Sequence, residues 1–141
     1  MGAATVLMAS DIVDEKNVVG IIADCPYSSP RDIIIKVAKD KGLNGKLLFP
    51  LVILSAKLFA GIDIDASSPV ESVKNTNIPI LIIHGDDDRF VPHYMGKAIY
   101  EACASENKKF LSVKDAGHAL SYCCDTETYV KTTKDFINSV I

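Results

Sequence analysis

The sequence lacks the features that mark several common classes of protein. It has no block of basic residues, and 15 lysines and arginines against 18 aspartates and glutamates give a net charge of −3. This balance argues against nucleic acid as a partner. No apolar run reaches the length of a membrane span, since the longest, residues 47–54, is interrupted by Pro50.

Signals for secretion are weak. The first ten residues are apolar but contain no basic residue, so they are a weak candidate for a signal peptide. The four cysteines form no CxxC pair, and Cys123 and Cys124 are adjacent. This pattern predicts reduced thiols in a cytoplasmic compartment, where the cysteines serve as small buried residues.

What is present is an alternation of apolar segments typical of an α/β domain. At 141 residues and 48 % hydrophobic, the chain suits one domain with a packed core. The spacing predicts about three parallel strands with helices on both faces, so that all the carboxyl ends of the strands lie at one edge. The expected strands are 18–23, 78–83 and 109–113. The expected helices are 2–10, one from Ser29 to about residue 42, one after Pro50, a short one after Ser68, one along 95–103, and a last one from Asp125 with Tyr129, Phe136, Ile137 and Val140 inward.

Polar side chains cluster where two of these strands end. Residues 84–88 (HGDDD) follow the second strand, and residues 115–118 (DAGH) follow the third. An acid and a histidine can therefore meet at the edge of the sheet, where the acid would fix the tautomer of the imidazole. Covalent catalysis by such a pair also needs a nucleophile and an oxyanion hole.

The three aspartates allow two other interpretations. Asp86, Asp87 and Asp88 could form a solvated acidic turn, or could bind a hard cation such as Mg²⁺. Three consecutive side chains do not all point at one ion from regular structure, so we expect no metal site. His84 is expected to be structural, hydrogen-bonded beneath the acid loop.

Several motifs together resemble the α/β-hydrolase fold family, on its serine esterase and peptidase side. Residues 84–92 (HGDDDRFVP) are similar to the HGxxDxxVP motif, and 116–118 (AGH) to the loop of the catalytic histidine. Residues 1–4 (MGAA) resemble those that follow the nucleophile in G-x-S-M-G, and further similar segments are 25–28 (CPYS) and 68–70 (SPV). The resemblance covers essentially the whole chain. It implies the C-terminal portion of such a fold, beginning just after the nucleophilic serine.

The resemblance implies a role for each matching position. Asp88 would be the acid of the triad, His118 the general base, and Met1 the residue whose backbone N–H binds the oxyanion. The serine would precede Met1, so the chain alone is expected to be inactive. The implied substrate is a small acyl compound (ester, thioester or amide), and no cofactor is implied. Residues 45–62 stand where the family often carries a cap, although they could equally pack on the sheet as core.

Three residues near His118 could replace the missing serine as the nucleophile. Ser121, Cys123 and Cys124 lie near His118 in the sequence, but none follows a strand-to-helix elbow. The alternative to a hydrolase is a binding or oligomerisation module. In either case the first strand would be left as an apolar edge, so we expect a homo-oligomer formed through that edge or through helix 2–10.

Overall fold

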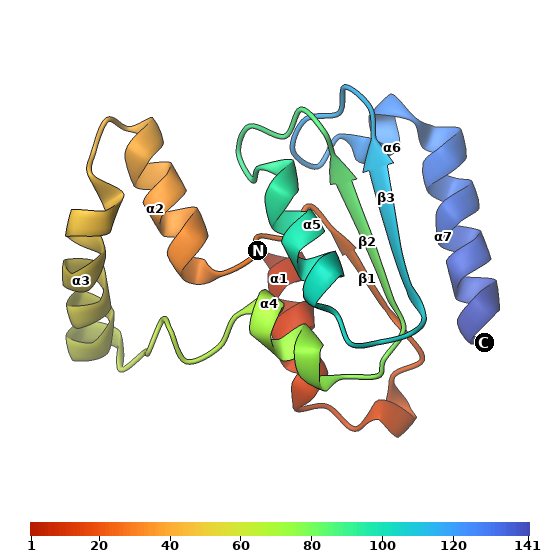
Figure 1. Ribbon diagram of the computed structural model, residues 1–141, viewed down its shortest axis with the longest axis horizontal. Coiled ribbons are helices and arrows are strands. Elements are labelled where there is room, and N and C mark those ends of the chain that lie inside the picture. The colour runs from red at the N-terminus through yellow and green to blue at the C-terminus, as the bar shows by residue number, and fades with distance from the viewer.

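The protein is built on a parallel three-stranded sheet with helices on both faces. The computed structural model describes residues 1–141, with strands β1 (Ile21–Asp24), β2 (Ile80–Gly85) and β3 (Lys108–Val113) in the order β1-β2-β3 (Figure 1). This confirms the α/β fold class and the three parallel strands. Pairing begins at Ile21 rather than at residue 18. Because β1 is the first strand in the order β1-β2-β3, it pairs only with β2 and its outer edge stays open.

The central strand separates two hydrophobic cores. Ile80 and Ile82 face one core with α1 (Gly2–Met8) and α5 (His93–Ala102), while Leu81 and Ile83 face the other with α7 (Thr126–Val140). All four strand residues are almost fully buried. Each contributes about 1.5–3 kcal/mol by leaving water, which explains why β2 is a continuous apolar run without alternation.

Side-chain caps define where several helices begin. Ser29 accepts the N–H of Asp32 at 3.0 Å and opens α2 (Pro30–Asp40), with Pro30 at the first helical position. Asp125 caps α7 through the N–H of Thr128, also at 3.0 Å, and this bond lowers the pKa of the Asp125 carboxyl. These two helix starts confirm the predictions. The remaining helices are α3 (Gly45–Ser55), α4 (Pro69–Ser72), α6 (Ser121–Cys124), the π-helical turn η3 (Ala56–Ala60), and the short 3₁₀ turns η1 (Ala9–Asp11), η2 (Glu15–Asn17) and η4 (Val73–Asn75).

Three local predictions are wrong. The helix expected after Pro50 begins at Gly45 instead, because the side chain of Asn44 caps it and Pro50 sits within it on an exposed face. Ile137 was expected on the inner face of the last helix but is 39 % exposed, because Phe136 alone of the two packs against the sheet. Cys123 and Cys124 are exposed on the short helix α6 rather than buried.

Helices α2 and α3 form a hairpin that packs on itself rather than on the sheet. In Figure 1 the two helices lie beyond α1 and α5, on the side away from the strands. The contact between them is close: a Cβ on Gly45 would fall 2.7 Å from the carbonyl oxygen of Ile35. Residues 45–62 therefore do not belong to either core, and Lys36 of α2 ties the hairpin to the loop after β2 by donating to the carbonyl oxygen of Arg89.

None of the helices has both the length and the apolar character needed to cross a bilayer.

Candidate active site

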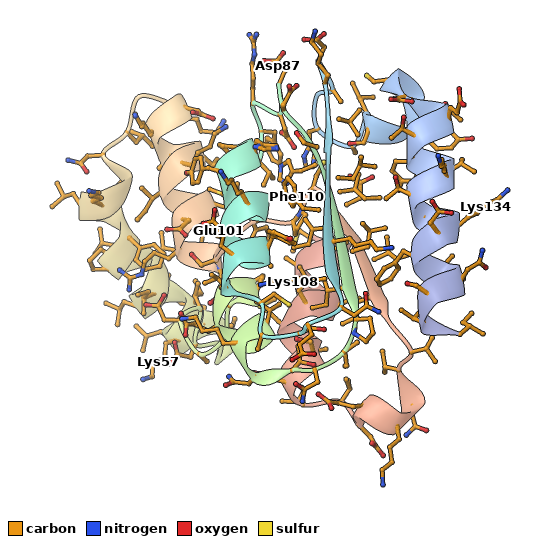
Figure 2. All side chains as sticks on the ribbon, turned by 45° about the vertical axis from the view of Figure 1, so that its right-hand side comes forward. Lys57, Asp87, Glu101, Lys108, Phe110 and Lys134 are labelled. Carbon is orange, nitrogen blue, oxygen red and sulfur yellow. The ribbon has the colours of Figure 1, made fainter.

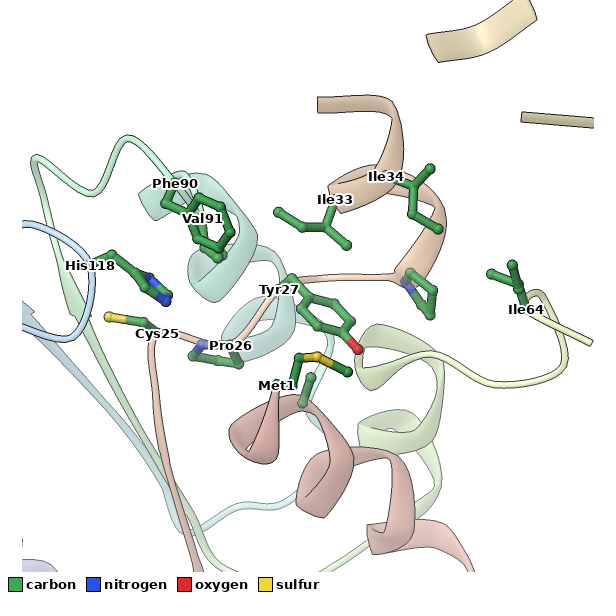
Figure 3. A pocket seen from close by; sticks show the side chains of 12 residues that line it. Met1, Cys25, Pro26, Tyr27, Ile33, Ile34, Ile64, Phe90, Val91 and His118 are labelled. Atoms are coloured by element: carbon green, nitrogen blue, oxygen red, sulfur yellow. The ribbon is translucent and has the colours of Figure 1, made fainter. Parts of the chain in front are cut away.

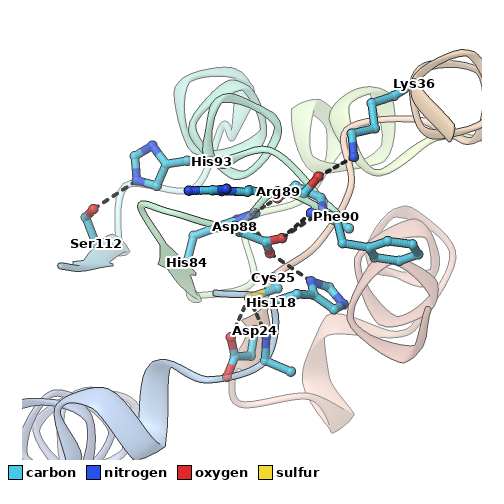
Figure 4. Close-up of polar contacts among 12 residues, drawn as sticks. Asp24, Cys25, Lys36, His84, Asp88, Arg89, Phe90, His93, Ser112 and His118 are labelled. Atoms are coloured by element: carbon cyan, nitrogen blue, oxygen red, sulfur yellow. Dashed lines mark hydrogen bonds and ion pairs between the residues drawn. The ribbon is translucent and has the colours of Figure 1, made fainter. Parts of the chain in front are cut away.

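The three loops that follow the strands bring Cys25, Asp88 and His118 together. Cys25 comes after β1, Asp88 after β2 and His118 after β3, all at the carboxyl edge of the sheet (Figure 4). The Cys25 sulfur, a carboxylate oxygen of Asp88 and a ring nitrogen of His118 lie within 4.8 Å of one another. Asp88 and His118 were selected from the sequence; Cys25 was not assigned a role.

Asp88 holds the imidazole of His118 in one orientation. Oδ2 of Asp88 lies 2.7 Å from Nδ1 of His118, while Oδ1 accepts the N–H groups of Phe90 at 2.9 Å and Val91 at 2.8 Å. The carboxyl side chain is fully buried, and the imidazole is 36 % exposed. An ionised carboxylate can only accept, so Nδ1 carries the proton and Nε2 is left as the basic nitrogen. The phenyl ring of Phe90 packs 5.1 Å from the imidazole.

The neighbouring aspartates have other partners. Asp86 accepts the N–H of Asp115 at 2.6 Å and ties the loop after β2 to the loop after β3. Asp87 pairs with the exposed guanidinium of Arg89 at 3.2 Å. The three consecutive carboxylates therefore face three different partners, which is not the convergent arrangement a hard cation requires.

His84 supports the acid loop from within the core. It is fully buried, and its Nε2 donates to the carbonyl oxygen of Val91 at 2.8 Å. Burial lowers the pKa of the imidazole below its usual value, so the ring is neutral, with the proton on Nε2. Nε2 also lies 3.5 Å from Oδ2 of Asp88. The position agrees with the structural role expected from the sequence.

Cys25 braces the loop that carries His118. Its Sγ accepts the N–H of Ala119 at 3.4 Å, and its thiol lies 3.2 Å from Oδ1 of Asp24 as a donor. Cys25, Asp115 and Ala119 are the three non-glycine residues with positive φ (51°, 55° and 59°), and all three lie beside His118. Backbone strain of this kind collects where surrounding contacts fix a functional side chain. This role depends on contacts between β1 and the loop after β3, so no local sequence pattern could have revealed it.

Cys25, Asp88 and His118 offer the sulfur, oxygen and nitrogen donors that a thiophilic metal prefers. Each donor is already engaged in a hydrogen bond within the protein. Burial also raises the pKa of the Cys25 thiol to about 12, which opposes the thiolate that a metal needs. The arrangement therefore favours the orientation of His118 over the binding of an ion.

An apolar cavity of about 390 Å³ opens beside His118. Figure 3 shows the imidazole pointing into it, opposite Ile33 and Ile34 of α2, with Met1 and Tyr27 on another side. Nine of the 12 residues that line the cavity are hydrophobic. The cavity thus places a basic nitrogen at the wall of a space suited to an apolar group.

The substitute nucleophiles considered from the sequence lie outside this cavity. Ser121 is fully buried, and its hydroxyl has no hydrogen-bond partner. Cys123 and Cys124 are exposed on α6. None of the three forms a hydrogen bond with His118.

Solved structures with a similar arrangement of strands and helices identify the fold. An esterase of Pyrococcus furiosus superposes on 99 % of this chain and 50 % of its own, with a TM-score of 0.70 at 20 % identity. An acylaminoacyl peptidase of Pyrococcus horikoshii covers 97 % of this chain and 22 % of its own, with a TM-score of 0.66 at 20 % identity. A family model described as Serine aminopeptidase, S33, matches residues 53–122. The chain has the α/β-hydrolase fold.

Two curated proteins are similar to this chain in sequence. The uncharacterized protein YqkD of Bacillus subtilis is 28 % identical over 142 residues, which is 99 % of this chain and 46 % of YqkD. The human Protein ABHD12B is 35 % identical over 72 residues, 48 % of this chain and 20 % of its own length. The chain thus spans less than half of each of these relatives.

Proposed function

We propose that residues 1–141 supply the acid and the base of a serine hydrolase that cleaves ester, thioester or amide bonds. The observation that carries this proposal is the 2.7 Å contact between Asp88 and His118 at the wall of an apolar cavity. Nε2 of His118 would take the proton of the serine hydroxyl as its oxygen attacks the acyl carbon, and would then give that proton to the leaving group. Asp88 would keep the ring in the correct tautomer and stabilise the imidazolium.

The nucleophile would be a serine placed directly before Met1, as the resemblance to G-x-S-M-G implies. Met1 lies at the N-terminus of α1 and lines the cavity together with His118. When Met1 is preceded by a residue, its backbone N–H would stabilise the oxyanion. Residues 1–141 alone would therefore lack acyl-transfer activity, while retaining the site for the acyl group.

The lining of the cavity favours an apolar acyl group as the part of the substrate that is bound. Ile33, Ile34 and Ile64 form its outer walls, and His118 supplies its basic nitrogen. No cofactor takes part in this chemistry. The four thiols are unpaired, which suits the reducing cytoplasmic compartment predicted from the sequence.

Ligand binding and covalent labelling test the two parts of this proposal. Titration with octanoate, followed by NMR of the histidine rings, should shift His118 and leave His93 unchanged. Ile33→Glu places a charge in the cavity and should abolish the shift, whereas Ile62→Glu, at an exposed position outside the cavity, should preserve it. A His118 signal that ignores octanoate contradicts the assignment of the acyl site.

Labelling addresses the missing nucleophile. A fluorophosphonate probe should leave the intact mass of residues 1–141 unchanged, because no serine lies beside His118. An adduct, above all at Ser121, would show that the chain carries a nucleophile of its own.

The open edge of β1 is the surface through which the chain would form a homo-oligomer. An apolar groove runs along this edge and is bounded by Val6 of α1, Ala9 of η1, Val18 and Ile22. Unpaired strand edges of this kind bind other chains readily. Light scattering at micromolar concentration should give at least a dimer, and a soluble monomer would refute this assembly.

A further inference from the structure

The outer face of α3 and η3 is an exposed apolar stripe. Leu47, Leu51, Leu54 and Leu58 follow helical spacing, and each is between 53 % and 73 % exposed. Phe59, which follows directly, is 90 % exposed. Single exposed leucines are ordinary, but a continuous stripe of this length marks a surface that contacts something else.

The stripe is not needed to hold the hairpin together. The opposite face of α3 does that work: Phe49 is 2 % exposed and stacks under the guanidinium of Arg31 at 4.4 Å. Gly45 allows the close approach to Ile35. Both faces of α3 are apolar, but only one of them packs within the fold. The other face is therefore free to contact a partner or a membrane.

Most of the charges around the stripe are positive. Residues 36–62 contain five lysines and one aspartate, whereas the other 114 residues contain ten basic and seventeen acidic side chains. Between residues 45 and 60 the only charges are Lys46 and Lys57, which flank the stripe. Figure 2 shows Lys57 extending outward from the hairpin. The hairpin is thus a basic, apolar projection on an otherwise acidic protein.

We propose that the stripe (Leu47, Leu51, Leu54, Leu58 and Phe59) docks the protein on the surface of a bilayer that contains anionic phospholipids. Apolar side chains would enter the boundary between headgroups and acyl chains, and Lys46 and Lys57 would contact the phosphates. The segment lies in the plane of the membrane, since it is too short to cross it. A second copy of the chain fits less well, because it would bring two basic hairpins together.

Docking would also place the acyl cavity next to the bilayer. Ile33 and Ile34, on the helix that pairs with α3, line that cavity. Because α2 lies between the stripe and this cavity, an acyl substrate from the bilayer would pass around the hairpin to reach His118. This last step rests on the proposed function, whereas docking itself depends only on the stripe and its lysines.

Vesicle co-sedimentation tests the docking without any measurement of activity. The protein should pellet with vesicles of equal parts phosphatidylcholine and phosphatidylglycerol, but not with phosphatidylcholine alone, and added salt should weaken the binding. Leu51→Glu with Leu58→Glu should abolish binding. Ile12→Glu, at a position 82 % exposed in the turn after η1, is the matched control and should bind as the wild type does. Lys46→Gln and Lys57→Gln should each weaken binding about fivefold.

Circular dichroism of each variant separates lost binding from lost folding. The proposal is overturned if the wild type ignores phosphatidylglycerol, if both vesicle types bind it equally, or if Ile12→Glu loses as much binding as the double variant. It is also overturned if light scattering without lipid shows a dimer that Leu58→Glu converts to a monomer, because the occupant is then a second copy. If the wild type binds the vesicles but octanoate does not shift the His118 signal, the result contradicts only the proposed function.

Discussion

Gly96 of α5 lies directly against the imidazole of His84 on β2. A Cβ at position 96 would overlap Nδ1 of His84 and lie 3.1 Å from its Cγ. Nδ1 is buried and has no hydrogen-bond partner, because the backbone of α5 covers it. The contact lets α5 approach the sheet closely and fixes the ring whose other nitrogen supports the acid loop at Val91.

Gly96→Ala should therefore destabilise the protein although alanine favours helices. The added methyl group would force His84 or α5 to move, at a cost of about 1–3 kcal/mol. Urea unfolding measures the free energy of unfolding. Gly2→Ala in α1, where a Cβ meets nothing within 4 Å, is the control and should leave stability nearly unchanged. Equal effects of the two substitutions would contradict the close contact.

His84 should make stability depend on pH. Burial lowers its pKa in the folded protein, so the unfolded chain binds more protons as the pH falls below the ordinary histidine value of about 6.5. Stability is therefore lost on acidification, by up to about 1.4 kcal/mol per pH unit for this one group. Urea unfolding at about pH 7.5 and about pH 5.5 measures the loss. His84→Gln should flatten the dependence, whereas His93→Gln, at a more exposed ring, should retain it.

The four thiols should fall into two classes of reactivity. Cys123 and Cys124 are exposed, whereas burial raises the pKa of Cys103 and brings that of Cys25 to about 12. Thiolate is the reactive form, so Ellman's reagent should label two thiols rapidly and two only as the protein opens. Cys123→Ser with Cys124→Ser should remove the rapid phase. Rapid labelling of Cys25 would show that its contact with Ala119 does not hold in solution.

The strands and the helical layers could be predicted from the sequence because strands buried on both faces appear as continuous apolar runs. The apolar runs at 78–83 and 109–113 led to the right strands, with β2 extending two residues further to include His84 and Gly85. The juxtaposition of Asp88 and His118 also followed, since parallel strands end at one edge.

Other features depended on contacts that periodicity does not encode. Cys25 acquires its role through the N–H of Ala119, 94 residues away. Residues 45–62 were expected to form either a cap or core packed on the sheet, and the outer leucines of α3 are exposed because α3 packs on α2 instead of the sheet. Pro50 suggested a helix start, but its missing N–H is tolerated within α3 at an exposed position.

Asp88→Asn should reverse the tautomer of His118 while leaving the loop folded. The amide oxygen can still accept the N–H groups of Phe90 and Val91, so its NH₂ group must face Nδ1. Nδ1 would then accept, the proton would move to Nε2, and the base facing the cavity would be lost. Nitrogen-15 NMR of the imidazole distinguishes the two tautomers.

Asp87→Asn is the matched control for this substitution. Asp87 contacts only the exposed Arg89, so its replacement should leave the spectrum of His118 unchanged. In a chain that carries a serine before Met1, Asp88→Asn should lower kcat by about 10⁴-fold and Asp87→Asn should have little effect. If His118 keeps its proton on Nδ1 in Asp88→Asn, the carboxylate does not set the tautomer. That result would contradict the assignment of Asp88 as the acid of a triad.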